Sequence, residues 1–337
     1  MLQGMLRSRL ASGCLFGAAF GDALGAPTEF LRVPEILARW PPRGPAEPAG
    51  HPALVTDDTQ MMLAVGEALV AVAGPLTARA VEAPLRDAFV AWLDSPDNDR
   101  APGRTCLQAC AALKEGLPFH EATVAGSKGC GANMRVQPIG LLDVDEETRA
   151  GLAQFQAALT HGHPTALAAS NLTAAAVALL VGGEEPARLP ARLRDYARAQ
   201  RVIYRESWLG PLWRRPGATT PEDFIARGWD ECLAVLDRLD AALAAFDRRS
   251  DPCLATGAGW IAEEALATGL LCFLLFPDDP TAAVRRAAVT SGDSDSIACL
   301  AGAFAGARHG LDAWPASWVD RIEHRPRLAA LGRAWDR

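Results

Sequence analysis

Apolar residues spaced three and four positions apart recur along most of this chain, and this spacing constrains its fold more than any other feature. The pattern is clearest at residues 59–73 and 222–249, and residues 191–208 and 261–276 share it. The positions expected to face a core are Met62, Val65, Leu69, Val72, Phe224, Cys232, Val235, Leu236 and Leu239. Alternating runs rich in Val, Ile and Tyr, which are typical of strands, are almost absent. The sequence therefore predicts an all-α fold with little β-sheet.

Two loops rich in proline and glycine interrupt the helical pattern, at residues 40–55 and 209–223. The helical segments on either side of each loop are similar in character, and no repeat of fixed period is present. Half of the 337 residues are apolar, which is enough for an extensive core. We therefore expect one compact domain over residues 1–337.

Residues 165–183 contain no charge and nearly reach the length of a membrane span. Alanine dominates this segment, and Ser170, Asn171 and Thr173 interrupt its apolar surface, so we expect a buried helix instead. The apolar run that follows Arg9 could be read as an export signal, but it is rich in glycine and soon reaches Asp22. We expect no membrane contact.

The net charge of −7 and the pI near 5.5 argue against a broad nucleic-acid-binding surface. They leave room for a small basic pocket that binds a phosphate-bearing ligand. Eight cysteines are scattered without a C-x-x-C pair, a pattern that indicates reduced thiols rather than a disulfide framework in a chain of this length. We expect a cytoplasmic monomer that binds no nucleic acid.

Glycines repeat every fourth residue near both ends of the chain, at Gly13, Gly17 and Gly21 and again at Gly302 and Gly306. Each glycine inside a helix costs about 1 kcal/mol relative to alanine, so such a row indicates that another backbone passes close by. The first row leads into GDALGAPTEF, and the second follows SGDSDS. The simplest interpretation is tight helix packing.

Two pairs of aspartates lie at expected helix starts, Asp57 with Asp58 and Asp293 with Asp295. Hydroxyl residues flank both pairs. Helix capping needs one side-chain oxygen and at most one further acid, so two such pairs exceed what capping requires. Hard oxygen ligands of this kind suit Mg²⁺ or Mn²⁺, and two ions can share bridging carboxylates. From the residues alone, metal binding and capping both remain open.

Six blocks occur in the order found in one enzyme family: GCLFGAAFGDALGAPTEF, TDDTQM, SKGCGANMRVQPIG, THGHP, GWIAEEALA and SGDSDSIACLAGAFAGA. The chain resembles the ADP-ribosylglycohydrolases over residues 11–310, nearly its whole length. Each block alone is only moderately specific, but six in order make chance similarity improbable. The resemblance implies a compact all-α domain with two divalent cations, Mg²⁺ or Mn²⁺, in a cleft.

The resemblance also implies roles for individual residues. Its metal-binding positions match Thr56, Asp57, Asp58, Asp293, Asp295 and Ser296, where the serine replaces a frequent threonine but keeps the hydroxyl. Glu29 matches an acid that approaches a metal or the catalytic water in some members. The residues expected to take part in catalysis are Glu29, Asp57, Asp58 and Asp295.

The block at residues 127–135 is the ligand loop by resemblance, with Ser127, Gly129, Cys130, Gly131, Met134 and Arg135 as substrate-binding positions. Its glycines also permit close approach of backbone N–H groups to phosphate oxygens. Cys130 replaces a common asparagine, and Lys128 replaces an aromatic residue found in some members. Arg135 could touch ligand or pair with a buried group.

The THGHP block contains two histidines, His161 and His163, which we expect to line the cleft without binding metal, because the proposed centre is an oxygen site. Trp260 and Glu263 could border the cleft as well, or belong to a buried helix with one polar face.

The reaction implied is hydrolysis of the glycosidic bond between ADP-ribose and an acceptor on a protein or small molecule. Arginine is favoured as the acceptor, and serine, another O-linked group or poly-ADP-ribose remain open. Two alternatives are a non-catalytic ADP-ribose-binding relative and a different metal-dependent phosphohydrolase, although the chain has no His-Asp pair typical of the latter. We also expect the proline-rich loop at residues 40–55, which lacks apolar periodicity, to pack weakly, and residues 26–50 to become ordered around Glu29 when ADP-ribose binds.

Overall fold

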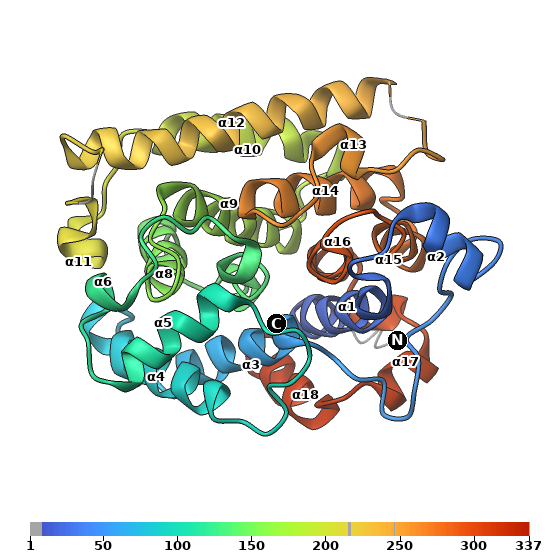
Figure 1. The fold of residues 1–337 in the computed structure, drawn as a ribbon, viewed down its shortest axis with the longest axis horizontal. Helices are drawn as coiled ribbons and strands as arrows, with labels where there is room; N and C mark the ends of the chain where they lie inside the picture. Colours follow the sequence, from blue (N-terminus) through green and yellow to red (C-terminus); the bar gives the residue numbers. More distant parts are fainter. Residues whose placement is uncertain (1–8, 215–216, 246, 337) are drawn as a thin grey trace, which may run out of the picture.

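The computed structural model describes residues 9–214, 217–245 and 247–336 (Figure 1). Its α-helices are α1 (Leu10–Gly25), α2 (Val33–Arg39), α3 (Asp57–Val70), α4 (Ala78–Leu93), α5 (Arg104–Lys114), α6 (Phe119–Ala122), α7 (Gln137–Gly140), α8 (Glu146–Ala158), α9 (Pro164–Val181), α10 (Leu189–Gln200), α11 (Glu206–Leu209), α12 (Pro221–Ala245), α13 (Cys253–Thr256), α14 (Ala262–Leu275), α15 (Pro280–Ala287), α16 (Ser294–His309), α17 (Ala316–Arg321) and α18 (Arg325–Trp335). Short 3₁₀ helices are η1 (Ala26–Thr28), η2 (Cys130–Ala132), η3 (Pro186–Arg188), η4 (Gly210–Trp213) and η5 (Leu311–Ala313). The described residues form only isolated β-bridges, so the all-α prediction is confirmed.

The glycine rows bring the two ends of the chain together, because α1 and α16 pack backbone against backbone (Figure 1). A Cβ atom added at Gly17 would lie 2.2 Å from the carbonyl oxygen of Gly302, and one at Gly21 would lie 1.9 Å from that of Ala298. Only glycine permits so close an approach. The prediction of tight packing is confirmed, and it places the end of α1 beside the start of α16.

The apolar face expected from the spacing is the buried face. Met62, Val65 and Leu69 are almost inaccessible to solvent, as are the five core positions predicted on α12. One cluster of buried apolar side chains extends from Ala11 to Leu331, which accords with a single domain over the described residues.

Helix ends differ from the expected ones by several residues. The helix expected over 191–208 stops at Gln200 and resumes as α11. Arg205 explains the interruption, because its buried guanidinium donates to Gln200 Oε1 at 2.7 Å and to Glu147 Oε2 at 2.8 Å. These contacts hold residues 201–205 outside a regular helix. The helix expected over 222–249 ends at Ala245, and residue 246 lies outside the described residues.

The uncharged segment 165–183 forms α9, which is long and apolar enough to cross a membrane but is 83% buried inside the protein. It packs against α8, α12, α14 and α16. Ser170, Asn171 and Thr173 are fully buried, and Asn171 Oδ1 accepts a hydrogen bond from the Tyr196 hydroxyl at 2.9 Å. The prediction of a buried helix is confirmed.

Residues 26–50, the segment expected to respond to ADP-ribose, contain the regular elements η1 and α2. Ile36 on α2 is fully buried, and the Val33 N–H donates to Ser291 Oγ at 2.9 Å. Helix α2 is therefore packed against the rest of the protein, whereas most of residues 40–55, the loop expected to pack weakly, are exposed. A helix of seven residues with one buried side chain is too short to produce a visible period.

Candidate active site

Asp22 fixes the turn that carries the first aspartate pair. Its carboxylate is fully buried at the end of α1 and accepts hydrogen bonds from the backbone N–H and the hydroxyl of both Thr56 and Thr59. The distances are 3.0 and 2.9 Å for Thr56, and 3.1 and 2.5 Å for Thr59. The N-terminus of α3 is thus attached to α1, and Asp57 and Asp58 are held beside α16. Sequence reasoning missed this role of Asp22, although GDALG was part of the matched block.

Three acids converge at the junction of α1 and α16. Glu29, Asp293 and Asp295 each offer one carboxylate oxygen, and these three oxygens lie within 4.8 Å of one another. Asp57 and Asp58 border the same cleft. The structure therefore brings together the two aspartate pairs and Glu29, which are far apart in sequence.

Helix capping does not account for these acids. Asp293 is the N-cap of α16 but makes no side-chain capping hydrogen bond, and the N-cap of α3 is Thr56. Asp58 Oδ1 is buried and has no hydrogen-bond partner among the described residues. A buried carboxylate oxygen without a donor is costly, so the site needs a cation or a proton there.

Burial and mutual repulsion make these carboxyl groups hard to ionise without a bound cation. Burial, aided by the charges of Asp293 and Asp57, raises the pKa of Glu29 to about 8. Burial likewise raises the pKa of Asp57 to about 7, and it raises the pKa values of Asp58 and Asp295 well above the usual range. Clustered oxygen donors of this kind fit a hard divalent cation, which would favour their charged forms.

The acids form one end of a cleft of about 410 Å³. Gly129, Cys130, Gly131 and Met134 of the Gly-rich loop form another part of its lining, together with His161. The loop is fastened to the segment before α14 by the Cys130 N–H, which donates to the Trp260 carbonyl at 3.2 Å. These predicted substrate-binding positions therefore share one cavity with the acids.

The close packing around this loop also requires glycine at position 131. A Cβ atom at Gly131 would lie 2.8 Å from Cys106 Sγ and 3.1 Å from the His161 ring, so the glycine leaves room for both side chains. Burial lowers the pKa of His161 to about 3, so the ring is neutral. Cys130 Sγ donates to Asp293 Oδ2 at 2.8 Å, which ties the loop to the acid cluster.

Four predicted site residues do not line the cleft. Thr56 turns its hydroxyl towards Asp22, and Ser127 Oγ lies 2.8 Å from the Thr105 hydroxyl. His163 is the N-cap of α9, where its Nδ1 accepts from the Thr165 N–H at 3.2 Å.

Arg135 is the fourth predicted site residue that does not line the cleft, and its side chain lies in the core. Its fully buried guanidinium donates to Gln156 Oε1 at 2.8 Å and to Thr160 Oγ1 at 2.8 Å, and it lies 4.3 Å from the centroid of the Phe89 ring. Of the two roles left open for Arg135, the structure supports the pairing with buried groups.

Lys128 and Glu263 pair with each other at 2.6 Å, and Lys128 Nζ also contacts Glu231 at 2.6 Å. Neither Lys128 nor Glu263 lines the cleft, whereas Trp260 does.

Arg104 is a cleft residue that sequence reasoning missed. It begins α5, borders the cavity, and forms no ion pair within the described part of the chain. The adjacent Gly103 N–H donates to Asp57 Oδ2 at 3.1 Å, which joins the start of α5 to the acid cluster. A cation directly after a glycine at a helix start was the available signal.

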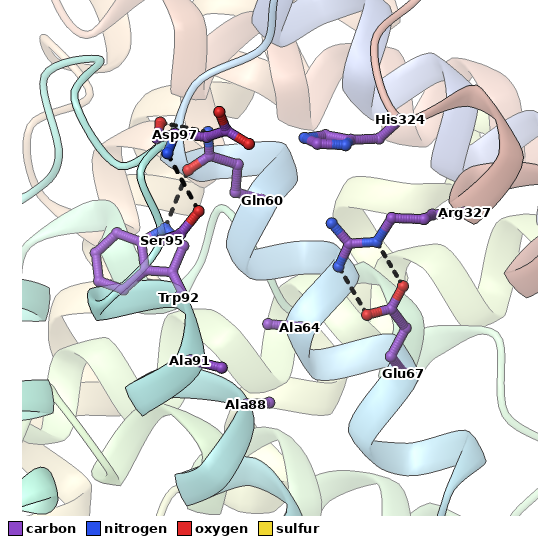
Figure 2. Close-up of a pocket in the computed structure, with 10 residues that line it drawn as sticks. All are labelled: Gln60, Ala64, Glu67, Ala88, Ala91, Trp92, Ser95, Asp97, His324 and Arg327. Carbon is purple, nitrogen blue, oxygen red and sulfur yellow. Dashed lines mark hydrogen bonds and ion pairs between the residues drawn. The ribbon is translucent and has the colours of Figure 1, made fainter.

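A second hollow of about 190 Å³ lies between α3, α4 and the start of α18 (Figure 2). Most of its polar groups already satisfy one another. Gln60 accepts from Trp92 Nε1 at 3.1 Å and donates to the Asp97 carbonyl at 3.0 Å, and Arg327 pairs with Glu67 at 2.7 Å (Figure 2). This hollow lacks a comparable group of converging acids among the residues that line it, so the acidic cleft is the candidate active site.

Comparison with known proteins agrees with this geometry. The family model described as ADP-ribosylglycohydrolase matches residues 4–337. The chain is 26% identical to the ADP-ribosyl-[dinitrogen reductase] glycohydrolase of Rhodospirillum rubrum, over 93% of this chain and 90% of that protein. It is 28% identical to the ADP-ribosylhydrolase ARH3 of Homo sapiens, over 92% and 88%. It is 25% identical to the ADP-ribosylarginine hydrolase Tri1 of Pseudomonas putida (strain GB-1), over 95% and 76%.

A solved structure titled ADP-ribosylglycohydrolase-related protein complex has the same fold, with a TM-score of 0.67, 23% identity and 98% coverage of both chains.

Proposed function

Because this chain belongs to the ADP-ribosylglycohydrolase family, a family of ADP-ribosyl hydrolases, we propose that it uses two divalent cations to cleave the glycosidic bond between ADP-ribose and an acceptor. The observation that carries the proposal is the buried Asp58 Oδ1, which lacks a donor beside the converging oxygens of Glu29, Asp293 and Asp295. A divalent cation satisfies such an oxygen and offsets the repulsion among the acids.

The residues proposed to hold Mg²⁺ or Mn²⁺ are Asp57, Asp58, Asp293 and Asp295, with the hydroxyl of Ser296 and the carboxylate of Glu29 as further oxygen donors. Thr56, whose hydroxyl is bound to Asp22, is left out of this set. Bound cations would supply Lewis acidity at the ribose hydroxyls and lower the pKa of a bound water. Glu29 is half-buried whereas the four aspartates are buried, so it is the acid most open to solvent, and we assign it proton transfer with this water.

The diphosphate of ADP-ribose is proposed to lie along the Gly-rich loop. Backbone N–H groups at Gly129 and Gly131 and the unpaired cation of Arg104 suit its negative charge. His161 lies beneath the loop and limits how deep the ligand enters.

Arginine is the acceptor we favour, with serine, other O-linked groups and poly-ADP-ribose as the alternatives. One relative is named for hydrolysis of ADP-ribosylarginine, which supports this choice. The substrate would be an ADP-ribosylated protein or small molecule in the cytoplasm, and the enzyme a monomer that contacts neither nucleic acid nor membrane. A non-catalytic ADP-ribose-binding role is the second candidate, and the presence of every acid expected for catalysis argues against it.

The test is release of ADP-ribose from ADP-ribosylated arginine, ADP-ribosylated serine and poly-ADP-ribose, with Mg²⁺, with Mn²⁺, and after exhaustive chelation. We expect hydrolysis of at least one substrate, its loss on chelation, and its recovery when the ion is returned. Full activity after chelation would overturn the metal proposal. Binding of ADP-ribose without hydrolysis of any of the three substrates would favour the non-catalytic role.

A further inference from the structure

Two aromatic side chains stack at the edge of the cleft. The ring centroids of Phe30 and Trp260 lie 5.5 Å apart, with 20° between the ring planes. Both residues line the cleft, yet 68% of Phe30 and 43% of Trp260 is exposed. The stacked rings cover part of each other, and the exposed remainder of both is open to a ligand. Exposed apolar groups at the rim of a polar cavity are typical of a binding surface.

Backbone hydrogen bonds anchor the segments that carry both rings to elements of the active site. Phe30 has a φ of 65°, a left-handed conformation that is rare for a bulky residue. The preceding Glu29 N–H donates to the Gly25 carbonyl at 3.0 Å, which anchors this turn to α1. The Trp260 carbonyl accepts from the Cys130 N–H at 3.2 Å, which anchors the indole to the Gly-rich loop. The ring pair therefore bridges the acid cluster and the loop.

The position of Phe30 places the pair on the reacting side of the substrate. Phe30 directly follows Glu29, whose carboxylate belongs to the three converging acids. Under the proposed function, cations at these acids hold the ribose that carries the acceptor. The adenine is separated from this ribose by the diphosphate and a second ribose. The rings therefore adjoin the acceptor rather than the adenine.

We propose that Phe30 and Trp260 form an acceptor subsite that selects the guanidinium of an ADP-ribosylated arginine. This inference rests on the proposed function and deepens it. A guanidinium is a planar, weakly hydrated cation that stacks on aromatic faces, and tryptophan is the best such face. A serine oxygen or a further ribose offers neither the plane nor the charge. The net charge of −7 also favours a cationic acceptor.

The experiment compares two peptides of one sequence that carry ADP-ribose on arginine or on serine. The ratio of kcat/KM for arginine over serine is measured for the wild type, Trp260→Ala, Trp260→Phe and Leu254→Ala. Leu254 is the control, because it is an apolar residue, 83% exposed, that does not line the cleft. Calorimetry with ADP-ribose and Mg²⁺ measures binding of a ligand that has no acceptor.

We expect Trp260→Ala to lower the ratio about tenfold, which is the size of a well-formed cation–π contact. Trp260→Phe should restore most of it, and Leu254→Ala should leave it unchanged. ADP-ribose affinity should fall less than kcat/KM for the arginine peptide. An unchanged ratio in Trp260→Ala, or an equal fall in ADP-ribose affinity, would overturn the subsite while leaving the proposed function intact. A wild-type enzyme that cleaves neither peptide would overturn both the arginine assignment and the subsite.

Discussion

At the scale of single residues, Asp58 shows why this site cannot be only a helix cap. Its Oδ1 is buried without a donor among the described residues, in a helix whose cap is already supplied by Thr56. Asp293, the N-cap residue of α16, also makes no side-chain capping hydrogen bond. Carboxylates that do not serve the helix, and that repel one another, destabilise the fold unless a ligand compensates.

Asp58→Asn and Asp295→Asn should inactivate the enzyme without unfolding it. We expect kcat/KM to fall at least about 100-fold, since even outer-shell partners of a metal are commonly worth 10- to 100-fold. The melting temperature in chelator should stay the same or rise, because one buried like charge is removed. Asp97→Asn is the control, as this residue is exposed and lies at the second hollow (Figure 2). A large fall in melting temperature for both variants would support the capping role instead.

Asp22→Ala should destabilise the protein by about 3 kcal/mol, because it leaves the buried donors of Thr56 and Thr59 without an acceptor. Activity should fall as well, since the turn that carries Asp57 loses its anchor. Urea unfolding measures the loss. Asp145→Ala, which removes an exposed capping carboxylate from α8, should cost clearly less. Equal costs would mean that Asp22 is no more than an ordinary cap.

At the scale of elements, the contact between α1 and α16 creates the site. It sets the end of one helix beside the start of the other, and the acids project from these two ends and from α3. The glycine rows set how closely the two helices approach, so they also set how close the acids come. The packing of these two helices thereby controls the geometry of the cleft.

Gly17→Ala should therefore lower the free energy of unfolding by about 3 kcal/mol or more, since its Cβ would overlap the Gly302 carbonyl. Gly126→Ala is a matched control, because a Cβ there meets no atom within 4 Å. Chemical denaturation distinguishes the two variants. Equal stability of both would show that α1 and α16 can separate without cost.

The segment from residue 26 to residue 50 is the element we expect to respond to ligand. ADP-ribose with Mg²⁺ should slow hydrogen exchange there, and most strongly at residues 26–32, because Glu29 and Phe30 border the cleft. Within α2, protection should already exist without ligand, since Ile36 is buried. Unchanged exchange at saturating ligand would contradict the prediction that this segment becomes ordered around Glu29.

At the scale of the whole molecule, the buried acids link stability to pH and to metal. In the metal-free protein the pKa of Glu29 is raised from 4.5 to about 8, and that of Asp57 from 3.8 to about 7. Between the unfolded and folded pKa values the folded state binds more protons, so its stability decreases as pH rises. A bound cation reverses the preference by favouring the ionised acids.

We therefore expect the melting temperature of the chelated protein to fall from about pH 4.5 to about pH 8, and Mg²⁺ to remove most of this fall. Thermal unfolding at several pH values, with chelator and with Mg²⁺, measures both effects. Glu29→Gln should flatten the slope in chelator. A chelated protein that becomes more stable over this range would contradict the linkage.

Patterns within short stretches of the sequence are sufficient to predict much of this protein's structure. Helical periodicity predicts the all-α fold and the buried face of α3 and α12, because each depends on residues three and four apart. The glycine rows predict a close helix contact. The two aspartate pairs mark four acids of the site, and only the resemblance to the ADP-ribosylglycohydrolases adds Glu29. Each of these features is encoded in a short stretch of chain.

Tertiary structure decided which of these residues meet, and which neighbours they meet. It placed Arg135 in the core, directed the Thr56 hydroxyl towards Asp22, and brought Arg104 to the cleft, which its position after Gly103 at a helix start only hinted at. It also stacked Phe30 on Trp260, which lie 230 positions apart in sequence. Such contacts depend on how distant helices pack and on which buried groups need partners, and no local spacing records either of these.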